Sequence, residues 1–306
     1  MTPSVPSTFF TDPPHWQWLI VLYFFVGGLA GGSYFIAALI DFFGRPQDRP
    51  FARLGYLVAF PAVVLSGILL IVDLTLPLRF WHMLIQSNTG QPMLKLYSPM
   101  SVGSWALLAF GFFALLSFLA ALGDAGWGPG RRLHVLRPPG VVGAIVAALG
   151  ASLGFFVAGY TGVLLAVTNR PIWSDTALLG LNFIISSAST SAALLILLGL
   201  WRWRSAGGIE RLERFDSLVL IVELVALAAL VATLGRIFWV WFSVWGVLLL
   251  VGVVLLGILA PLALHWRPRT LGHALTAPVA AVLVLLGGFM LRVVIVMSSS
   301  GMGTGG

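Results

Sequence analysis

Long apolar stretches, separated by short segments rich in proline, glycine and charge, dominate the pattern of this chain. A helix needs about 20 apolar residues to cross a bilayer. Eight stretches of about that length or longer are predicted at residues 16–43, 54–76, 102–122, 141–167, 174–200, 217–240, 243–265 and 274–297. They are too long for barrel strands, and an open sheet would leave its backbone unsatisfied in lipid. The pattern therefore predicts an all-α membrane protein with eight transmembrane helices.

The composition agrees with a multi-pass membrane protein. Of 306 residues, 59% are hydrophobic and only 9% are charged, whereas soluble domains carry about 25% charged residues. The chain has no cysteine, which excludes disulfides and iron–sulfur clusters held by its own thiolates. Its pI near 10.8 would suggest nucleic acid in a soluble protein, but basic loops in a membrane protein report topology. We therefore expect the protein to lie in a lipid bilayer and not to bind nucleic acid.

Positive charges fall unevenly on the two sides of the predicted membrane. The loops after the first, third, fifth and seventh spans hold twelve arginines, whereas the opposite loops hold only Arg79, Lys95 and Arg170. By the positive-inside rule the arginine-rich side is cytoplasmic. Both termini then lie on the extracytoplasmic side, and the even number of spans permits a division into two groups of four.

Polar and aromatic residues gather where the second predicted span meets water on the outer side. They are Asp73, Arg79, Trp81 and His82, with Tyr160, His15 and Gln17 at the same level of the membrane. Quinone chemistry moves two protons with two electrons, so its site needs hydrogen-bond donors and a carboxylate or imidazole that exchanges protons with water. The alternative interpretation is that Asp73 is an interfacial carboxylate paired with Arg79.

The charged residues inside predicted spans include Glu223, Arg236 and Arg292. A charge in hydrocarbon costs from about 2.5 kcal/mol upward and needs a partner or a task. Glu223 and Arg236 are separated by roughly 20 Å along one helix, so they do not pair with each other. Two interpretations stay open for Glu223: a place in a proton path, or a hydrogen bond to the hydroxyl-rich face of the fifth span.

Intrinsic haem or metal is not expected. Haem held by two histidines needs two imidazoles that face each other within the membrane. The five histidines fall at span ends or in loops, at positions 15, 82, 134, 265 and 273. No two of them have metal-ligand spacing on one helix face. A redox metal would therefore belong to a partner.

Glycines in the first span predict close helix packing. Gly27, Gly28, Gly31 and Gly32 form two overlapping GxxxG patterns, which let another helix approach the backbone. The fifth span carries Ser186, Ser187, Ser189, Thr190 and Ser191, and such hydroxyls commonly hold neighbouring helices together.

Four segments resemble the membrane subunit of polysulfide reductase and its NrfD-type relatives. These are the first-span run from Tyr23 to Tyr34, the run from Asp73 to His82, the run from Ser98 to Trp105, and Tyr160-Thr-Gly with the downstream Trp173. The resemblance covers nearly the whole chain. It implies a haem-free, quinone-binding subunit built as two four-helix bundles, at 16–167 and 168–297, with an extracytoplasmic segment at 1–15 and a short tail at 298–306.

The same resemblance implies roles for single residues. Tyr160 would donate a hydrogen bond to the quinone, Asp73 and His82 would serve proton exchange, and His15 and Gln17 would contribute to the site. The sequence departs from the family after Asp73-Leu74, where many relatives have Gly-Arg and this chain does not. That departure alters the local charge balance, although Arg79 remains nearby.

We therefore predict a quinol/quinone-reactive anchor subunit of a respiratory oxidoreductase complex in a bacterial or archaeal cytoplasmic membrane. It would use menaquinone or ubiquinone and exchange electrons with a four-cluster iron–sulfur subunit, accompanied by a molybdopterin catalytic subunit. One alternative is a subunit of alternative complex III or a related energy-conserving complex with a proton path. A second is a secondary transporter, which would show repeat symmetry and broken helices, and the sequence shows neither clearly.

Overall fold

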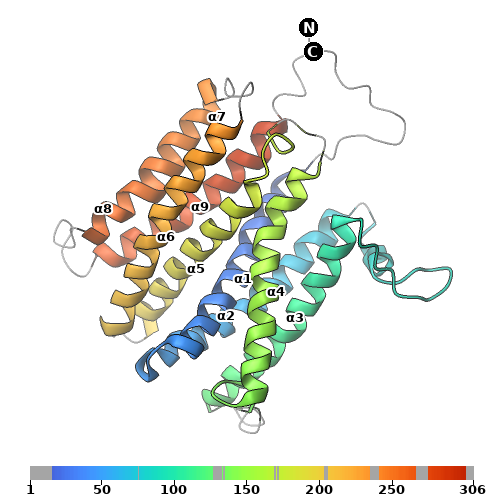
Figure 1. The fold of residues 1–306 in the computed structure, drawn as a ribbon, viewed down its shortest axis with the longest axis horizontal. Coiled ribbons are helices and arrows are strands. Elements are labelled where there is room, and N and C mark those ends of the chain that lie inside the picture. The colour runs from blue at the N-terminus through green and yellow to red at the C-terminus, as the bar shows by residue number, and fades with distance from the viewer. Residues whose placement is uncertain are drawn as a thin grey trace.

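Eight long apolar helices make up most of the protein in this computed structural model (Figure 1). The structure describes residues 16–74, 76–126, 133, 135–168, 170, 172–202, 206–234, 241–266 and 275–300. Each of the eight is long and apolar enough to cross a membrane. The predicted fold class, an all-α membrane protein with eight spans, is confirmed.

The spans follow one another along the chain with short connections. They are α1 (Trp18–Phe43), α2 (Arg49–Asp73), α3 (Pro99–Asp124), α4 (Val141–Ala166), α5 (Leu179–Arg202), α6 (Ala206–Thr233), a seventh span and α9 (Thr276–Ser300). The seventh span joins α7 (Val244–Val247), a π-helical stretch (Leu248–Leu259) and α8 (Ala260–Trp266). Two 3₁₀ segments, Pro46–Asp48 and Pro77–Met83, flank α2.

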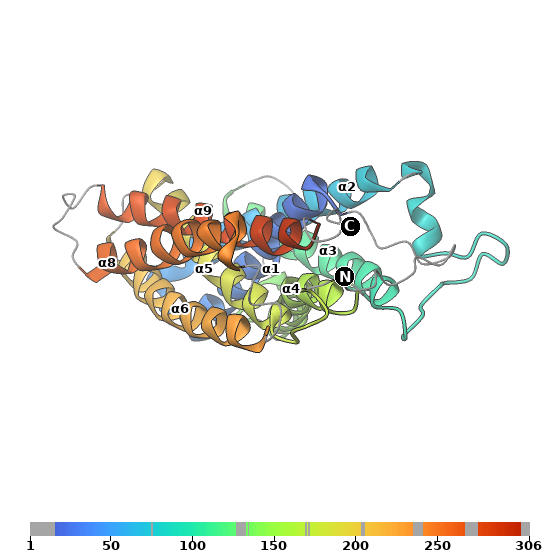
Figure 2. The same ribbon diagram turned by 90° about the horizontal axis from the view of Figure 1, so that it is seen from above.

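Helix α1 lies at the centre of the molecule. It packs against α2, α4, α5 and α9. Helices α2 to α4 lie to one side of it, and α5 to α9 lie to the other side (Figures 1 and 2).

Small residues explain why α1 can take this central place. A Cβ atom on Gly28 or Gly32 would overlap side chains of the serine face of α5, and one on Gly31 would overlap the backbone of Gly154 in α4. The two GxxxG patterns therefore face different neighbours, because one side of α1 meets α5 and the other meets α4. The prediction of close helix packing here is confirmed.

The two ends of the helix assembly differ, and we name each by one residue. At the Asp73 end, α1 starts and α2, α4 and α9 end; at the Arg137 end, α1 ends and α2 and α4 start. Trp16 stacks on Trp173 at the Asp73 end, with ring centroids 5.3 Å apart. The Trp173 indole donates to the Ile295 carbonyl at 2.8 Å. These contacts tie the first described residues, the α4–α5 connection and α9 together at one end.

Several helix boundaries differ from the prediction, most of all the start of α6. Helix α5 begins at Leu179 rather than 174, because residues 174–178 lie in turns that continue from the buried Trp173. Helix α6 begins at Ala206, well before the predicted 217, and therefore includes Asp216. Charged residues near the start of α6 explain why the predicted sixth span is shorter than the helix.

Candidate functional site

The connection between α2 and α3 carries three of the predicted site residues, Arg79, Trp81 and His82. It starts with the 3₁₀ segment Pro77–Met83 and turns back at an antiparallel bridge between Ile85 and Pro92. The His82 ring is half-buried and lies edge-on to Trp81, with centroids 3.9 Å apart. This connection extends beyond the ends of the helices (Figures 1 and 2).

The Ser98-to-Trp105 run anchors that connection to α3. The Ser98 hydroxyl caps α3 by accepting from the Ser101 amide at 3.4 Å, and Pro99 occupies the first helical position, where its missing N–H costs nothing. The Ser101 hydroxyl and the Trp105 indole both donate to the Met93 carbonyl, at 3.2 and 3.1 Å. The Ser98-to-Trp105 run therefore holds the end of the α2–α3 connection against the start of α3.

Tyr160 lies inside the α1–α4 group near the Asp73 end. Its side chain is buried and stacks on Phe156, with centroids 5.8 Å apart. A Cβ on Gly103 of α3 would overlap the phenol carbons and the hydroxyl oxygen of Tyr160. The glycine at 103 is thus what leaves room for the Tyr160 ring.

A second phenol, Tyr23 of α1, lies close enough to Tyr160 for the two hydroxyl groups to interact electrostatically. Neither hydroxyl makes a hydrogen bond to another of the described residues. A Cβ on Gly27 would lie 3.7 Å from the Tyr23 ring and 3.6 Å from the Ser66 hydroxyl of α2. Polar groups from three helices therefore meet in an otherwise apolar interior.

Asp73 ends α2 at the surface of the same helix group. It is exposed and follows Ser66 by seven residues, so it lies on the same helix face and about 10 Å further along the axis. Among the described residues it forms no ion pair with Arg79. The structure therefore does not support the alternative interpretation, in which Asp73 is an interfacial carboxylate paired with Arg79.

The described site residues share one end of the molecule, but Asp73, His82 and Tyr160 are not joined to one another. No hydrogen bond or ion pair within the described ranges joins Asp73, His82 and Tyr160. Gln17 is exposed at the start of α1, and His15 lies outside the described residues.

The second predicted constellation surrounds Arg292 of α9, which is fully buried. Its guanidinium donates to the Ser186 and Ser187 hydroxyls of α5 at 2.6 and 3.1 Å, and to the Gly288 carbonyl at 2.7 Å. Glu223 of α6 interacts with the Ser186 hydroxyl and, through its charge, with Arg292. The hydroxyl of Ser186 therefore lies between the buried cation and the buried carboxylate.

Sequence reasoning missed two polar groups. Asp216, at 0% exposure, accepts a hydrogen bond from Ser189 at 2.8 Å, and Tyr23 was not assigned to a site. Position 216 precedes 223 by seven residues, so Asp216 lies on the same face of α6 as Glu223, and this spacing could have revealed it. Arg236 lies outside the described residues.

Comparison with known proteins gives the family. A family model described as polysulphide reductase, NrfD, matches residues 6–301. The chain belongs to the polysulphide reductase NrfD family. The resemblance predicted from the four motifs is confirmed.

Three relatives show how far the similarity to individual NrfD-family proteins extends. Protein NrfD of Escherichia coli is 28% identical, over 94% of this chain and 95% of the relative. A component of the polysulfide reductase of Wolinella succinogenes is 29% identical over 60% of this chain, and the match spans 58% of that relative. A component of the selenate reductase of Mesobacillus selenatarsenatis is 27% identical over 35% of this chain and 22% of the relative.

Proposed function

We propose that this NrfD-family protein is the quinol/quinone-reactive membrane anchor subunit of an oxidoreductase complex. The observation that carries the proposal is the pair of phenol hydroxyls, on Tyr23 and Tyr160, which lie near each other without hydrogen-bond partners among the described residues. A quinone has two carbonyl oxygens that accept hydrogen bonds, and phenols can supply the donors. An apolar pocket with a few convergent polar groups suits a ligand with an isoprenoid tail.

Asp73 and His82 take the proton-exchange role in this proposal. Oxidation of a quinol releases two protons, which must reach water through groups that titrate. Asp73 is exposed, and His82 is half-buried on the connection beside it. The phenols hold the headgroup inside the helix group, and Asp73 and His82 pass its protons to the surface. Gln17, His15, Arg79 and Trp81 complete the proposed surroundings of the site.

The α2–α3 connection offers a contact surface for a partner at the same end. Leu78, Leu96 and Tyr97 are 89%, 79% and 83% exposed. Large apolar side chains so exposed often mark an interaction surface. Two relatives are named as components of polysulfide and selenate reductases. We assign this surface to a peripheral iron–sulfur subunit with four clusters, accompanied by a molybdopterin subunit, which exchanges electrons with the quinone, either menaquinone or ubiquinone.

The charge distribution supports one orientation of the chain. The loops after the first, third, fifth and seventh spans contain the twelve arginines counted in the sequence, and the order of the spans assigns these loops to the Arg137 side. By the positive-inside rule that end faces the cytoplasm. The quinone site and the partner then lie on the outer face of a bacterial or archaeal cytoplasmic membrane.

A second candidate function, proton conduction in an energy-conserving complex, is favoured by the polar groups between α5, α6 and α9. Asp216 and Glu223 lie about 10 Å apart on one face of α6, and Ser186 connects Glu223 to Arg292. The second oxygen of Asp216 has no hydrogen-bond partner among the described residues. Buried carboxylates in such positions often belong to proton paths. The transporter alternative has no comparable support.

One spectroscopic experiment tests the main proposal. The complex is purified with its native partners, a reduced menaquinol analogue is added anaerobically, and iron–sulfur signals are followed by electron paramagnetic resonance. We expect cluster reduction that a quinone-site inhibitor blocks. Absence of co-purifying clusters, or clusters that ignore the quinol, would refute the anchor-subunit function.

A further inference from the structure

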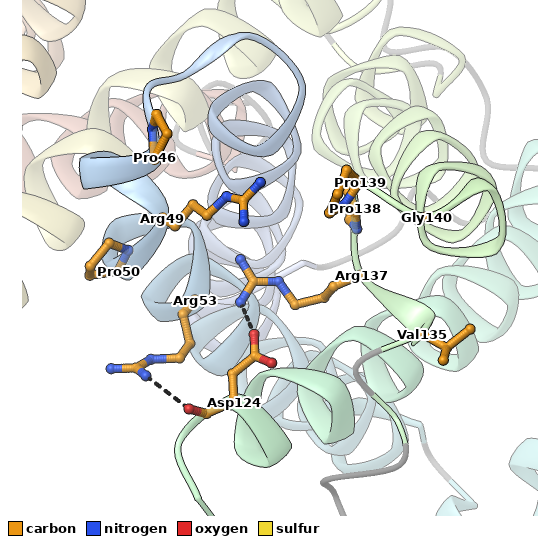
Figure 3. Close-up of a pocket in the computed structure, with 10 residues that line it drawn as sticks. All are labelled: Pro46, Arg49, Pro50, Arg53, Asp124, Val135, Arg137, Pro138, Pro139 and Gly140. Carbon is orange, nitrogen blue, oxygen red and sulfur yellow. Dashed lines mark hydrogen bonds and ion pairs between the residues drawn. The ribbon is translucent and has the colours of Figure 1, made fainter.

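A cavity of about 600 Å³ lies at the Arg137 end of the α1–α4 group (Figure 3). The proposed quinone site lies at the opposite, Asp73 end. The cavity lies between the start of α2 and the segment that leads into α4. Its lining consists of Pro46, Arg49, Pro50, Arg53, Asp124, Val135, Arg137, Pro138, Pro139 and Gly140. Three guanidinium groups and one carboxylate thus line a cavity whose other lining residues are mostly prolines and apolar groups.

Arg137 forms the fixed wall of this cavity. It pairs with Asp41 of α1 at 2.9 Å and with Asp124 of α3, and its guanidinium lies over the Tyr56 ring at 5.5 Å. Burial lowers the pKa of Arg137, but Asp41 and then Asp124 raise it, so the pKa lies above its ordinary value. Arg137 therefore stays charged, and its two carboxylate partners hold its side chain in place.

The charges around the cavity do not balance. Arg53 donates to the Asp124 backbone carbonyl at 3.5 Å. Arg49 is exposed and forms no ion pair within the described ranges, and Figure 3 shows its side chain extending toward the space beside Arg137. The three arginines face two carboxylates, Asp41 and Asp124. Counted over these described side chains, the cavity has an excess of one positive charge.

The start of α4 adds to the positive potential of the cavity. Its N-cap is Gly140, which offers no side-chain cap. The first N–H groups of a helix lack partners within the helix, and they favour a negatively charged group. Here they supplement the arginines and do not define a site on their own.

An exposed apolar stripe on α4 begins beside the cavity. Val141, Ile145 and Leu149 are 76%, 53% and 47% exposed. Residues four apart lie on the same side of a helix, so these three form a continuous stripe that leads from the cavity into the depth of the membrane. Val135, which lines the cavity, is also exposed.

We propose that this cavity binds the phosphodiester headgroup of an anionic phospholipid, with an acyl chain along Val141, Ile145 and Leu149. Arg49 and Arg53 contact the phosphate, and the single negative charge of a phosphodiester balances the excess positive charge. Basic pockets between membrane helices are suited to anionic headgroups. The site uses the topology proposed above, which places it in the inner leaflet, but it does not depend on the quinone site.

The test measures lipids bound to the purified complex by native mass spectrometry. The probes are phosphatidylglycerol and, as a zwitterionic comparison, phosphatidylethanolamine, each added to delipidated protein. We expect wild type to retain phosphatidylglycerol preferentially. We expect Arg49→Gln/Arg53→Gln to bind it roughly 30-fold more weakly, since each of the two basic groups near a lipid surface contributes about 1 kcal/mol. The control is Arg202→Gln/Arg214→Gln, which removes two exposed arginines at the same end of the molecule. Equal phosphatidylglycerol binding by both variants would overturn the proposal.

A second arm separates a lipid from a free anion. Val141→Ser/Ile145→Ser keeps every arginine but interrupts the apolar stripe, and we expect it to weaken phosphatidylglycerol binding as well. Thermal unfolding is then followed with phosphatidylglycerol or with inorganic phosphate. We expect stabilisation of wild type by phosphatidylglycerol alone. Equal stabilisation by inorganic phosphate, or unchanged lipid binding in the serine variant, would reject the lipid site. This second variant also decides the question if the arginine variant fails to fold.

Discussion

Replacing Gly103 by alanine is the sharpest test of the proposed role of Tyr160. The new methyl group would overlap the Tyr160 ring and its hydroxyl oxygen. Ordinary contact between carbon atoms needs about 3.5 Å, so the ring must retreat by more than about 1 Å. Tyr160 is buried and stacked on Phe156, so the retreat moves the hydroxyl out of its native position.

The size of the effect follows from the hydrogen bond that is lost. A phenol donates at about 2.8 Å, and a displacement of more than about 1 Å takes the hydroxyl beyond bonding distance. A typical hydrogen bond contributes about 0.5–1.5 kcal/mol. We therefore expect Gly103→Ala to lower kcat/KM for quinol by roughly two- to tenfold.

The assay is quinol oxidation by membranes in which the amount of assembled complex has been determined. The matched control is Gly111→Ala, because it changes the same residue type in the same helix and its Cβ would meet nothing within 4 Å. In a Tyr160→Phe background the hydroxyl is already absent, so we expect Gly103→Ala to add little further loss of kcat/KM. Such non-additivity is the mark of two changes that act through one interaction.

Two results would refute this reasoning. If Gly103→Ala has the same kcat/KM as Gly111→Ala, the position of the Tyr160 ring does not matter to quinol turnover. If Gly103→Ala and Tyr160→Phe lower kcat/KM additively, the glycine acts through something other than the phenol hydroxyl.

Three further substitutions test separate parts of the account. Asp73→Asn is expected to lower quinol turnover while the complex stays assembled, and unchanged turnover would remove this carboxylate from proton exchange. Glu223→Gln is expected to abolish proton movement in liposomes without loss of electron transfer; if both fall together, or neither changes, the proton path fails. Arg137→Gln leaves Asp41, whose side chain is 1% exposed, as an unpaired buried charge, so we expect destabilisation by about 3–5 kcal/mol, seen as a lower Tm. The control is Arg214→Gln, which breaks an exposed ion pair with Glu210 and is expected to lower the free energy of unfolding by less than about 1 kcal/mol. Equal Tm values in the two variants would contradict the prediction.

The number and type of the spans could be predicted because lipid imposes a strong constraint on the chain. A helix needs about 20 consecutive apolar residues to cross the hydrocarbon core. All eight stretches were recognised because their composition meets this requirement. The glycines of α1 were also informative, since close helix approach requires small residues. Their partners, α4 and α5, became known only from the structure.

Residues that depend on a partner from another helix were harder to predict. Asp216 falls just outside the predicted sixth span, but it is buried in α6, where one of its carboxylate oxygens accepts a hydrogen bond from Ser189 of α5. Trp173 was noted only as a motif residue before the fifth span, and its indole, in a buried turn, donates to the Ile295 carbonyl of α9. A pattern along one helix does not contain such pairings, because they depend on how helices pack.

The candidate quinone site was also only partly predictable, because it depends on contacts between helices. The order of spans along the chain predicted that Asp73, His82 and Tyr160 share one end of the molecule. The nearness of Tyr23 and the space left by Gly103 depend on how α1, α3 and α4 pack.

Labelling with a photoreactive quinone tests the central claim most directly. The natively purified complex is illuminated with an azidoquinone, with or without an excess of unlabelled quinol analogue, and labelled peptides are identified by mass spectrometry. The account predicts competable label on this chain, in the peptides of α1 and α4 that contain Tyr23 and Tyr160. Label confined to another subunit, or to α5–α9 of this chain, would contradict it.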